Sequence, residues 1–124
     1  MRKMIYALAA VAVMVAAAPA QADAKAEDGR VGLSVRGKGL RVDSVGAHME
    51  GHGTGVQARV VSYSPRGVRS VVTDWKDATP VSAAMTKLST VGWSWKGGKR
   101  FADRTRLCVE FNAAPGEPCV VIHR

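Results

Sequence analysis

The sequence has 124 residues and a formal net charge of +8, with 47% hydrophobic and only 6% aromatic residues. This length allows one small domain, and the excess of positive charge favours anionic partners. No nucleotide-binding fingerprint, paired-cysteine metal motif or catalytic signature occurs in it, so the sequence assigns neither a cofactor nor an enzymatic activity.

Residues 1–22 have the pattern of a cleavable secretory signal peptide. Arg2 and Lys3 precede an apolar run from Ile5 to Ala18, and a small-residue Ala-Gln-Ala motif ends at Ala22, after which we expect cleavage. The run of about 14 residues is shorter than the roughly 20 that cross a bilayer, and no later segment is longer. The sequence therefore predicts a secreted, extracellular protein without a membrane span, whose net charge after loss of Arg2 and Lys3 falls from +8 to +6.

Residues 23–30 carry charges and small side chains without periodicity, which predicts a flexible leader. From Val31 onward the apolar residues are mostly β-branched, with 15 Val and one Ile against four Leu, and they alternate with polar residues in several short segments. We therefore predict one all-β domain over residues 31–124, an antiparallel β-sandwich of immunoglobulin-like shape.

The connections between the predicted strands also have recognisable signals. Gly37-Lys38-Gly39 predicts a hairpin turn, and the glycine-rich stretch Met49–Gly55 predicts a mobile loop. Thr79 is a suitable helix cap and Pro80 suits a first helical position. We therefore expect at most one short helix, of no more than two turns, ending near Lys87.

The two cysteines, Cys108 and Cys119, are expected to form a disulfide, because an even cysteine count in an exported chain favours pairing; two free buried thiols are the alternative. Antiparallel partners keep a constant index sum, so facing cysteines pair Leu107 with Val120 and Thr105 with Ile122. The disulfide then lies on the outer or less buried side of this hairpin. The apolar side faces the core and consists of Leu107, Val109, Phe111, Val120 and Ile122. The spacing is not the Cys-x-x-Cys of redox motifs, which favours a structural role.

Trp93 and Trp95 lie on the same side of a predicted strand, where two large rings either join the core or form a platform for sugar rings or a protein partner. A Gly-Gly turn follows and presents several cations beside them. The candidate binding surface consists of Trp93, Trp95, Lys96, Lys99, Arg100, Arg104 and Arg106. Such a surface attracts an anionic cell-wall polymer or an extracellular protein; the alternative is a solvated basic turn. No nucleic-acid-binding module is recognisable, so no specific nucleic-acid partner is expected.

Two arrangements of histidines are considered as a metal site or a catalytic site. His48 and His52 have the i, i+4 spacing of a helical metal pair, but the surrounding glycines disfavour a helix, which indicates an ordinary polar loop and no metal site. His123, Glu110 and Arg106 are expected on the outer face of the last hairpin, and such residues occur in small ribonucleases. A cross-strand pair is the simpler interpretation, so no catalytic residue is assigned.

The segments Gly92–Phe101, Leu107–Val109 and Pro118–Val120 resemble the carboxyl-terminal half of small exported β proteins of high-GC actinomycetes. The resemblance implies an extracellular, disulfide-stapled β domain and no activity. The secreted protease and amylase inhibitors of such bacteria carry four cysteines, and the amylase inhibitors a Trp-Arg-Tyr triplet, both of which this chain lacks.

Three functions are therefore compared. The first is a non-enzymatic interaction protein that uses the basic aromatic surface. The second is an inhibitor of a secreted protease or glycosidase, which inserts a loop such as Met49–Gly55 or Asn112–Pro118 into the enzyme's cleft. The third is a small secreted ribonuclease.

Overall fold

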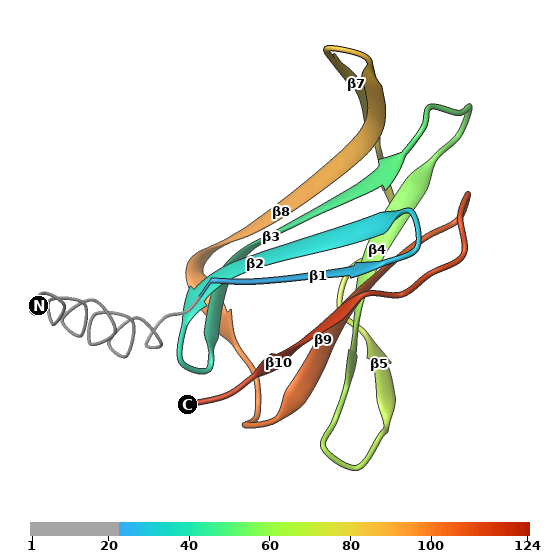
Figure 1. Cartoon of the computed structure of the whole chain (residues 1–124). Coiled ribbons are helices and arrows are strands. Elements are labelled where there is room, and N and C mark those ends of the chain that lie inside the picture. The colour runs from blue at the N-terminus through green and yellow to red at the C-terminus, as the bar shows by residue number, and fades with distance from the viewer. Residues whose placement is uncertain (1–22) are drawn as a thin grey trace, which may run out of the picture.

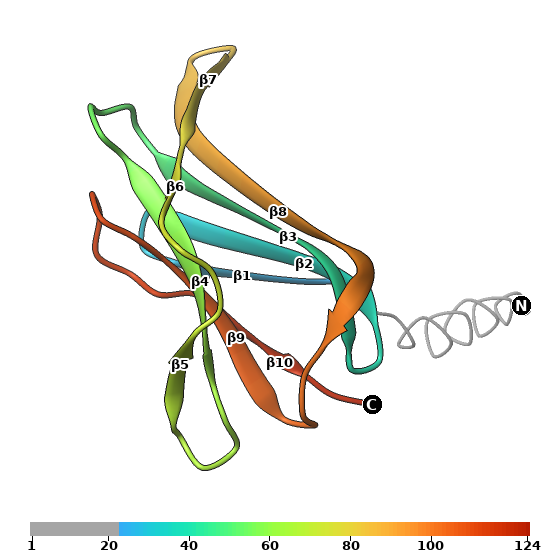
Figure 2. The ribbon, with the colours of Figure 1, turned by 180° about the vertical axis from the view of Figure 1, so that it is seen from behind.

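The computed structural model describes residues 23–124, which contain ten strands and no helix. They form two antiparallel sheets, as Figures 1 and 2 show from opposite sides. The strands are β1 (Ala24–Asp28), β2 (Val31–Lys38), β3 (Arg41–Glu50), β4 (Gln57–Tyr63), β5 (Arg69–Val71), β6 (Lys76–Asp77), β7 (Thr79–Ala83), β8 (Thr86–Arg100), β9 (Thr105–Phe111) and β10 (Cys119–Ile122). The predicted all-β antiparallel sandwich is confirmed, whereas the predicted signal peptide lies outside the described residues.

The first sheet, called sheet A here, has the order β1-β2-β3-β8-β7, and the second, sheet B, has the order β10-β9-β4-β5, with β6 beside β4. Strands β1 to β3 follow one another as a meander. The chain then crosses between the sheets three times, after β3, β6 and β8. No helix of residues 23–124 is long and apolar enough to cross a membrane.

The core lies between the sheets and follows from the alternation of side chains along each strand. Leu107, Val60 and Val109 in the middle of sheet B are completely buried. Sheet A contributes Val31, Leu33, Val35, Val42, Val45, Ala47, Met49, Val91 and Trp93 to the same cluster. The intervening residues of β2, β3 and β8 therefore form the outer face of sheet A.

Residues Ala24–Asp28, expected to belong to a flexible leader, form β1. All five pair with β2, from Ala24 opposite Val35 to Asp28 opposite Val31. Ala24 and Ala26 are partly buried against the core, while the charged residues between them face outward. The segment has the two-residue period of a strand, but its inward residues are only alanines, so the apolar signal in the sequence is weak.

The expected short helix after Thr79 is wrong, because this segment is a β-hairpin. Strand β7 pairs with the start of β8, from Thr79 opposite Thr90 to Ala83 opposite Thr86. Every residue of β7 is exposed. A two-turn helix here has no face to bury, and isolated helices this short are unstable, whereas the hairpin gains pairing with β8. We call residues 79–90 the β7–β8 hairpin.

The expected mobile loop over Met49–Gly55 is also shorter than the sequence suggested. Strand β3 continues to Glu50, and Met49 is 2% exposed within the core. His48 therefore lies in a strand and not in a polar loop. The irregular part begins at Gly51, whose φ of 104° is a conformation that favours glycine.

Candidate functional site

The predicted disulfide is present and joins Cys108 of β9 to Cys119 at the start of β10. The predicted register is confirmed as well, with Leu107 opposite Val120 and Thr105 opposite Ile122. Cys108 is fully buried although it lies on the outer face of sheet B, because other side chains cover it.

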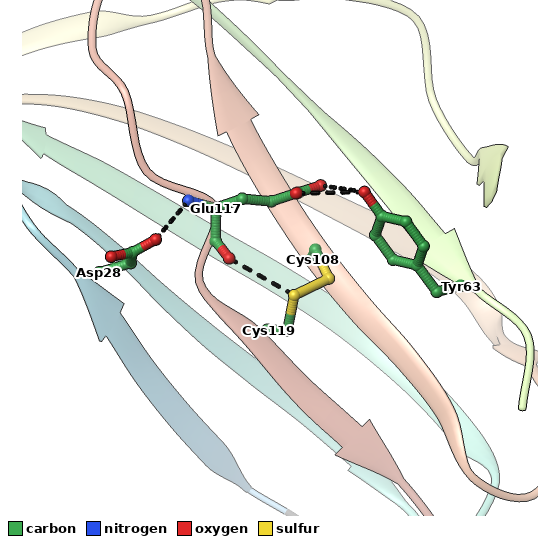
Figure 3. Close-up of a disulfide and its surroundings, with 5 residues drawn as sticks. All are labelled: Asp28, Tyr63, Cys108, Glu117 and Cys119. Carbon is green, nitrogen blue, oxygen red and sulfur yellow. Dashed lines mark hydrogen bonds between the residues drawn. A yellow bond between two sulfur atoms is a disulfide. The ribbon is translucent and has the colours of Figure 1, made fainter. Parts of the chain in front are cut away.

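Glu117 and Tyr63 provide part of that cover, and Figure 3 shows them beside the disulfide. The Tyr63 hydroxyl donates to the Glu117 carboxylate, with O–O distances of 2.9 and 3.1 Å. The Glu117 backbone N–H donates to the Asp28 carboxylate at 2.9 Å. One residue thus connects β1, β4 and the β9–β10 loop, which supports a structural role for the disulfide.

The two tryptophans of the predicted surface are largely turned toward the interior. Trp93 is 9% exposed and belongs to the core cluster, and Trp95 is half-buried and packs against it. The two interpretations of this pair were core residues and a binding platform, and the structure places Trp93 in the core. The exposed part of the candidate surface is therefore formed by its cations.

Lys96, Lys99 and Arg100 are exposed on a bend near the end of β8. The pairing of β8 with β3 shifts there, because Ser44 lies opposite Ser94 but Val42 lies opposite Lys99. Gly97 and Gly98 have φ values of 79° and 81° and make the bend possible.

This bend places three cations side by side on neighbouring strands of sheet A. Lys38 of β2 lies opposite Arg41 of β3, and Arg41 lies opposite Arg100 of β8. We call these three residues the basic row. Only Arg41 among them forms an ion pair in the described part of the chain, with Asp43 at 2.9 Å. Like charges directly opposite one another destabilise a sheet, so the basic row works against folding.

Sequence reasoning identified Arg100 but missed Lys38 and Arg41. These residues flank the turn Gly39-Leu40 between β2 and β3, whereas the sequence predicted the turn at Gly37-Lys38-Gly39, which includes Lys38. With the turn at Gly39-Leu40, Lys38 pairs with Arg41, a pairing that the predicted turn did not give. Their neighbour on β8 requires the pairing of segments more than 50 positions apart, which no local pattern gives.

Arg104 and Arg106 are exposed but do not extend the basic row. Arg106 lies on the outer face of sheet B, where its guanidinium stacks on the Tyr63 ring at 4.8 Å from the ring centroid. Arg104 lies in the turn between β8 and β9, and its backbone N–H donates to the Ile122 carbonyl at 2.7 Å. The predicted surface is thus divided between two faces of the sandwich.

The outer face of sheet B carries a separate ionic network that the sequence analysis did not find. The Glu110 carboxylate bonds to Arg59 at 2.6 Å and to Arg69 at 3.0 Å. Arg59 also stacks on Trp75, 4.4 Å from the ring centroid. A hydrogen bond to Tyr63 and the charge of Glu110 raise the pKa of Arg69. These contacts tie β4, β5 and β9 together.

The residues considered for ribonuclease chemistry are not brought together. Glu110 is held by its two arginines, and His123 follows β10 beside the opposite end of β9. Continuing the register of β9 and β10 places His123 opposite Arg104, six positions from Glu110 along β9. With a rise of about 3.3 Å per residue, His123 and Glu110 are therefore roughly 20 Å apart.

The two other histidines have separate surroundings. The His48 imidazole lies across Gly32 of β2, where it occupies the space of a side chain. The His52 ring is 3.0 Å from the Val81 carbonyl oxygen, in the middle of strand β7. Among residues 23–124, no group of three or more His, Cys, Asp or Glu side chains is placed to hold a metal ion.

No family model matches the chain, and no curated protein or solved structure matches it significantly. The function is therefore inferred from the geometry of this chain. Two exposed features stand out from the structural contacts described above: the basic row at one end of sheet A and the β7–β8 hairpin at the other end.

Proposed function

We propose that this chain is an exported, non-enzymatic binding protein that holds an anionic polymer at the basic end of sheet A. The basic row is the observation that carries the proposal. Opposing cations lower stability, so their placement on three adjacent strands indicates use by a negatively charged partner. The signal-peptide pattern, the disulfide and the resemblance to small exported proteins support export.

Further cations lie near the basic row. Lys96 and Lys99 are exposed on the same bend of β8 as Arg100, although Lys99, opposite the inward-facing Val42, points to the other side of sheet A. In the described part of the chain, the three ion pairs are Arg41–Asp43, Arg59–Glu110 and Arg69–Glu110. Lys38, Lys96, Lys99 and Arg100 therefore take part in none of them. Free cations from separate strands suit a polymer, whose repeated charges engage several sites at once.

Lys38→Gln combined with Arg100→Gln is expected to weaken binding to a soluble polyanion about 10-fold or more at low salt. The same change relieves repulsion within the basic row, so the free energy of unfolding is expected to stay the same or rise by a few tenths of a kcal/mol. Affinity is measured by titration calorimetry with polygalacturonate and with polyphosphate, between about 0.05 M and about 0.5 M salt. Stability is measured by urea denaturation.

The matched control is Arg66→Gln combined with Lys87→Gln. Arg66 lies in the turn before β5 and Lys87 in the β7–β8 hairpin, and both are exposed. This variant has the same net charge as the first, so an effect of total charge alone weakens both equally. Equal weakening, or wild-type binding that does not change with salt, contradicts a site at the basic row.

The β7–β8 hairpin favours a second candidate function, inhibition of a secreted hydrolase. Its tip carries Met85, which is 96% exposed, and Ala84 in a left-handed conformation with φ of 56°. The hairpin stands beyond the body of the two sheets in Figures 1 and 2. A protruding, strand-supported loop with an apolar tip has the shape that enters an enzyme cleft.

The strands of this hairpin are held in place by neighbouring residues, and the two loops considered from the sequence are tied down as well. Gly51 donates from its backbone N–H to the Lys87 carbonyl at 2.7 Å, beside the contact between His52 and Val81. In the β9–β10 loop, the Asn112 side chain donates to the Gly55 carbonyl at 2.9 Å. The hairpin tip is thus the freest of the three loops.

Purified protein is expected to inhibit at least one member of a panel of secreted proteases and glycosidases if the tip inserts. Met85→Ala then weakens inhibition about 30-fold, as for a central contact residue, and leaves stability unchanged because the side chain is exposed. The control is Val68→Ala, which removes another exposed apolar side chain, 62% exposed, before β5. Absence of inhibition at micromolar protein removes this candidate.

A further inference from the structure

A shallow hollow of about 280 Å³ lies on the outer face of sheet A, next to the basic row. Three serines, one arginine and two glycines provide most of its lining: Ser34, Ser44, Ser94, Arg36, Gly46 and Gly92. Arg36 is two positions from Lys38 on the same strand, β2. The hollow and the basic row therefore form one continuous surface.

The strand register explains why this area is hollow. Ser34, Gly46 and Gly92 lie opposite one another on β2, β3 and β8. Ser44 lies opposite Arg36 on one side and Ser94 on the other. The residues between them in each strand point into the core, so these side chains face outward, and most of them are small.

Neither glycine is required by the fold. A Cβ atom at Gly46 meets nothing within 4 Å, and one at Gly92 meets only a backbone oxygen at 3.9 Å. Neither residue is among the glycines with positive φ. Glycine within a strand costs roughly 0.5–1 kcal/mol relative to alanine, and it commonly marks a place where a ligand approaches the backbone.

The side chains that line the hollow indicate which class of ligand it binds. Serine hydroxyls both donate and accept hydrogen bonds, as sugar hydroxyls do. The Arg36 guanidinium and the basic row provide charge for carboxylates, which guanidinium groups bind in a two-point geometry. Binding a polymer that carries only charge requires the cations. It does not require a hollow lined by serine hydroxyls in which two glycines leave space for a ligand.

We infer that the hollow receives a sugar unit of an acidic polysaccharide, whose carboxylates are bound by Arg36 and the basic row. This inference rests on the proposed binding of an anionic polymer and specifies the class of polymer. It assigns two tasks to two parts of one surface: the basic row attracts charge, and the hollow distinguishes a sugar chain from another polyanion.

Gly46→Val tests the hollow, because its side chain enters open space above a strand that favours β-branched residues. The variant is expected to be as stable as the wild type or more stable. Its affinity for polygalacturonate, an acidic polysaccharide, falls about 10-fold or more, whereas its affinity for inorganic polyphosphate is unchanged. Lys38→Gln with Arg100→Gln, in contrast, lowers the affinity for both polymers.

Thr90→Val is the matched control, since Thr90 is on the outer side of β8 and outside the hollow. It is expected to leave both affinities unchanged. Unchanged polygalacturonate binding by Gly46→Val, or tighter wild-type binding to polyphosphate than to polygalacturonate, overturns the assignment of the hollow while the basic row retains its function. If the wild type binds neither polymer, the proposed function itself fails.

Discussion

Replacing both cysteines, Cys108→Ala with Cys119→Ala, is expected to lower the free energy of unfolding by about 3 kcal/mol. The disulfide closes a loop between positions separated by 11 in sequence, and its loss frees that loop in the unfolded chain. Cys108 is completely buried, so alanine is chosen because it leaves no buried hydroxyl without a partner. For a domain of this size the midpoint of thermal unfolding falls by roughly 10–20 °C.

Urea denaturation of the variant and of the wild type with and without a reductant measures this effect. The reduced wild type is expected to unfold at nearly the urea concentration of the double variant, because both lack the same constraint. If the free energies of unfolding of the oxidised wild type and the variant differ by less than about 1 kcal/mol, the disulfide is not a principal stabilising feature.

Gly37→Ala is expected to lower the free energy of unfolding by about 2–3 kcal/mol. Gly37 lies where the pairing of β2 with β3 shifts, and an added Cβ collides with the Arg41 carbonyl oxygen and comes within 2.8 Å of the Val42 Cα. Both obstacles are backbone atoms, so no side-chain rotation relieves the collision. Because the collision separates β2, which holds Lys38, from β3, which holds Arg41, binding to polyanions is expected to fall as well.

Gly46→Ala is the control for this prediction. It makes the same chemical change on the neighbouring strand of the same sheet, but above open space. It is expected to be neutral or to raise the free energy of unfolding by up to about 1 kcal/mol, measured by the same urea titration. Equal loss of stability in the two variants indicates a general effect of side chains on this sheet and contradicts the collision at Gly37.

The parts of the fold that the sequence predicted correctly are those with a strong local signal. The last hairpin has alternating apolar residues on both strands, and its two cysteines fix the register once they are paired. The β7–β8 hairpin was mistaken for a helix because Thr79-Pro80 and the alanines nearby have helical preferences of their own. Pairing with β8, which is a tertiary contact, outweighs them.

The candidate site was predictable only in part, for a related reason. Lys96, Lys99 and Arg100 are close in sequence, so their charge is visible without the fold. The basic row and the hollow arise where three strands from distant parts of the chain lie in register. The pairing of Gly46 with Gly92 had only one sequence signal, glycine inside otherwise strand-like segments.

The hydrogen bond between Asp28 and Glu117 has a consequence for the order of events during synthesis. It joins residues 89 positions apart, so β1 is fastened to the β9–β10 loop only after almost all of the described chain has been made. Cys119, the second cysteine, comes later still. Such long-range closure delays folding, so the sandwich is completed only after β10, the last strand, has been made.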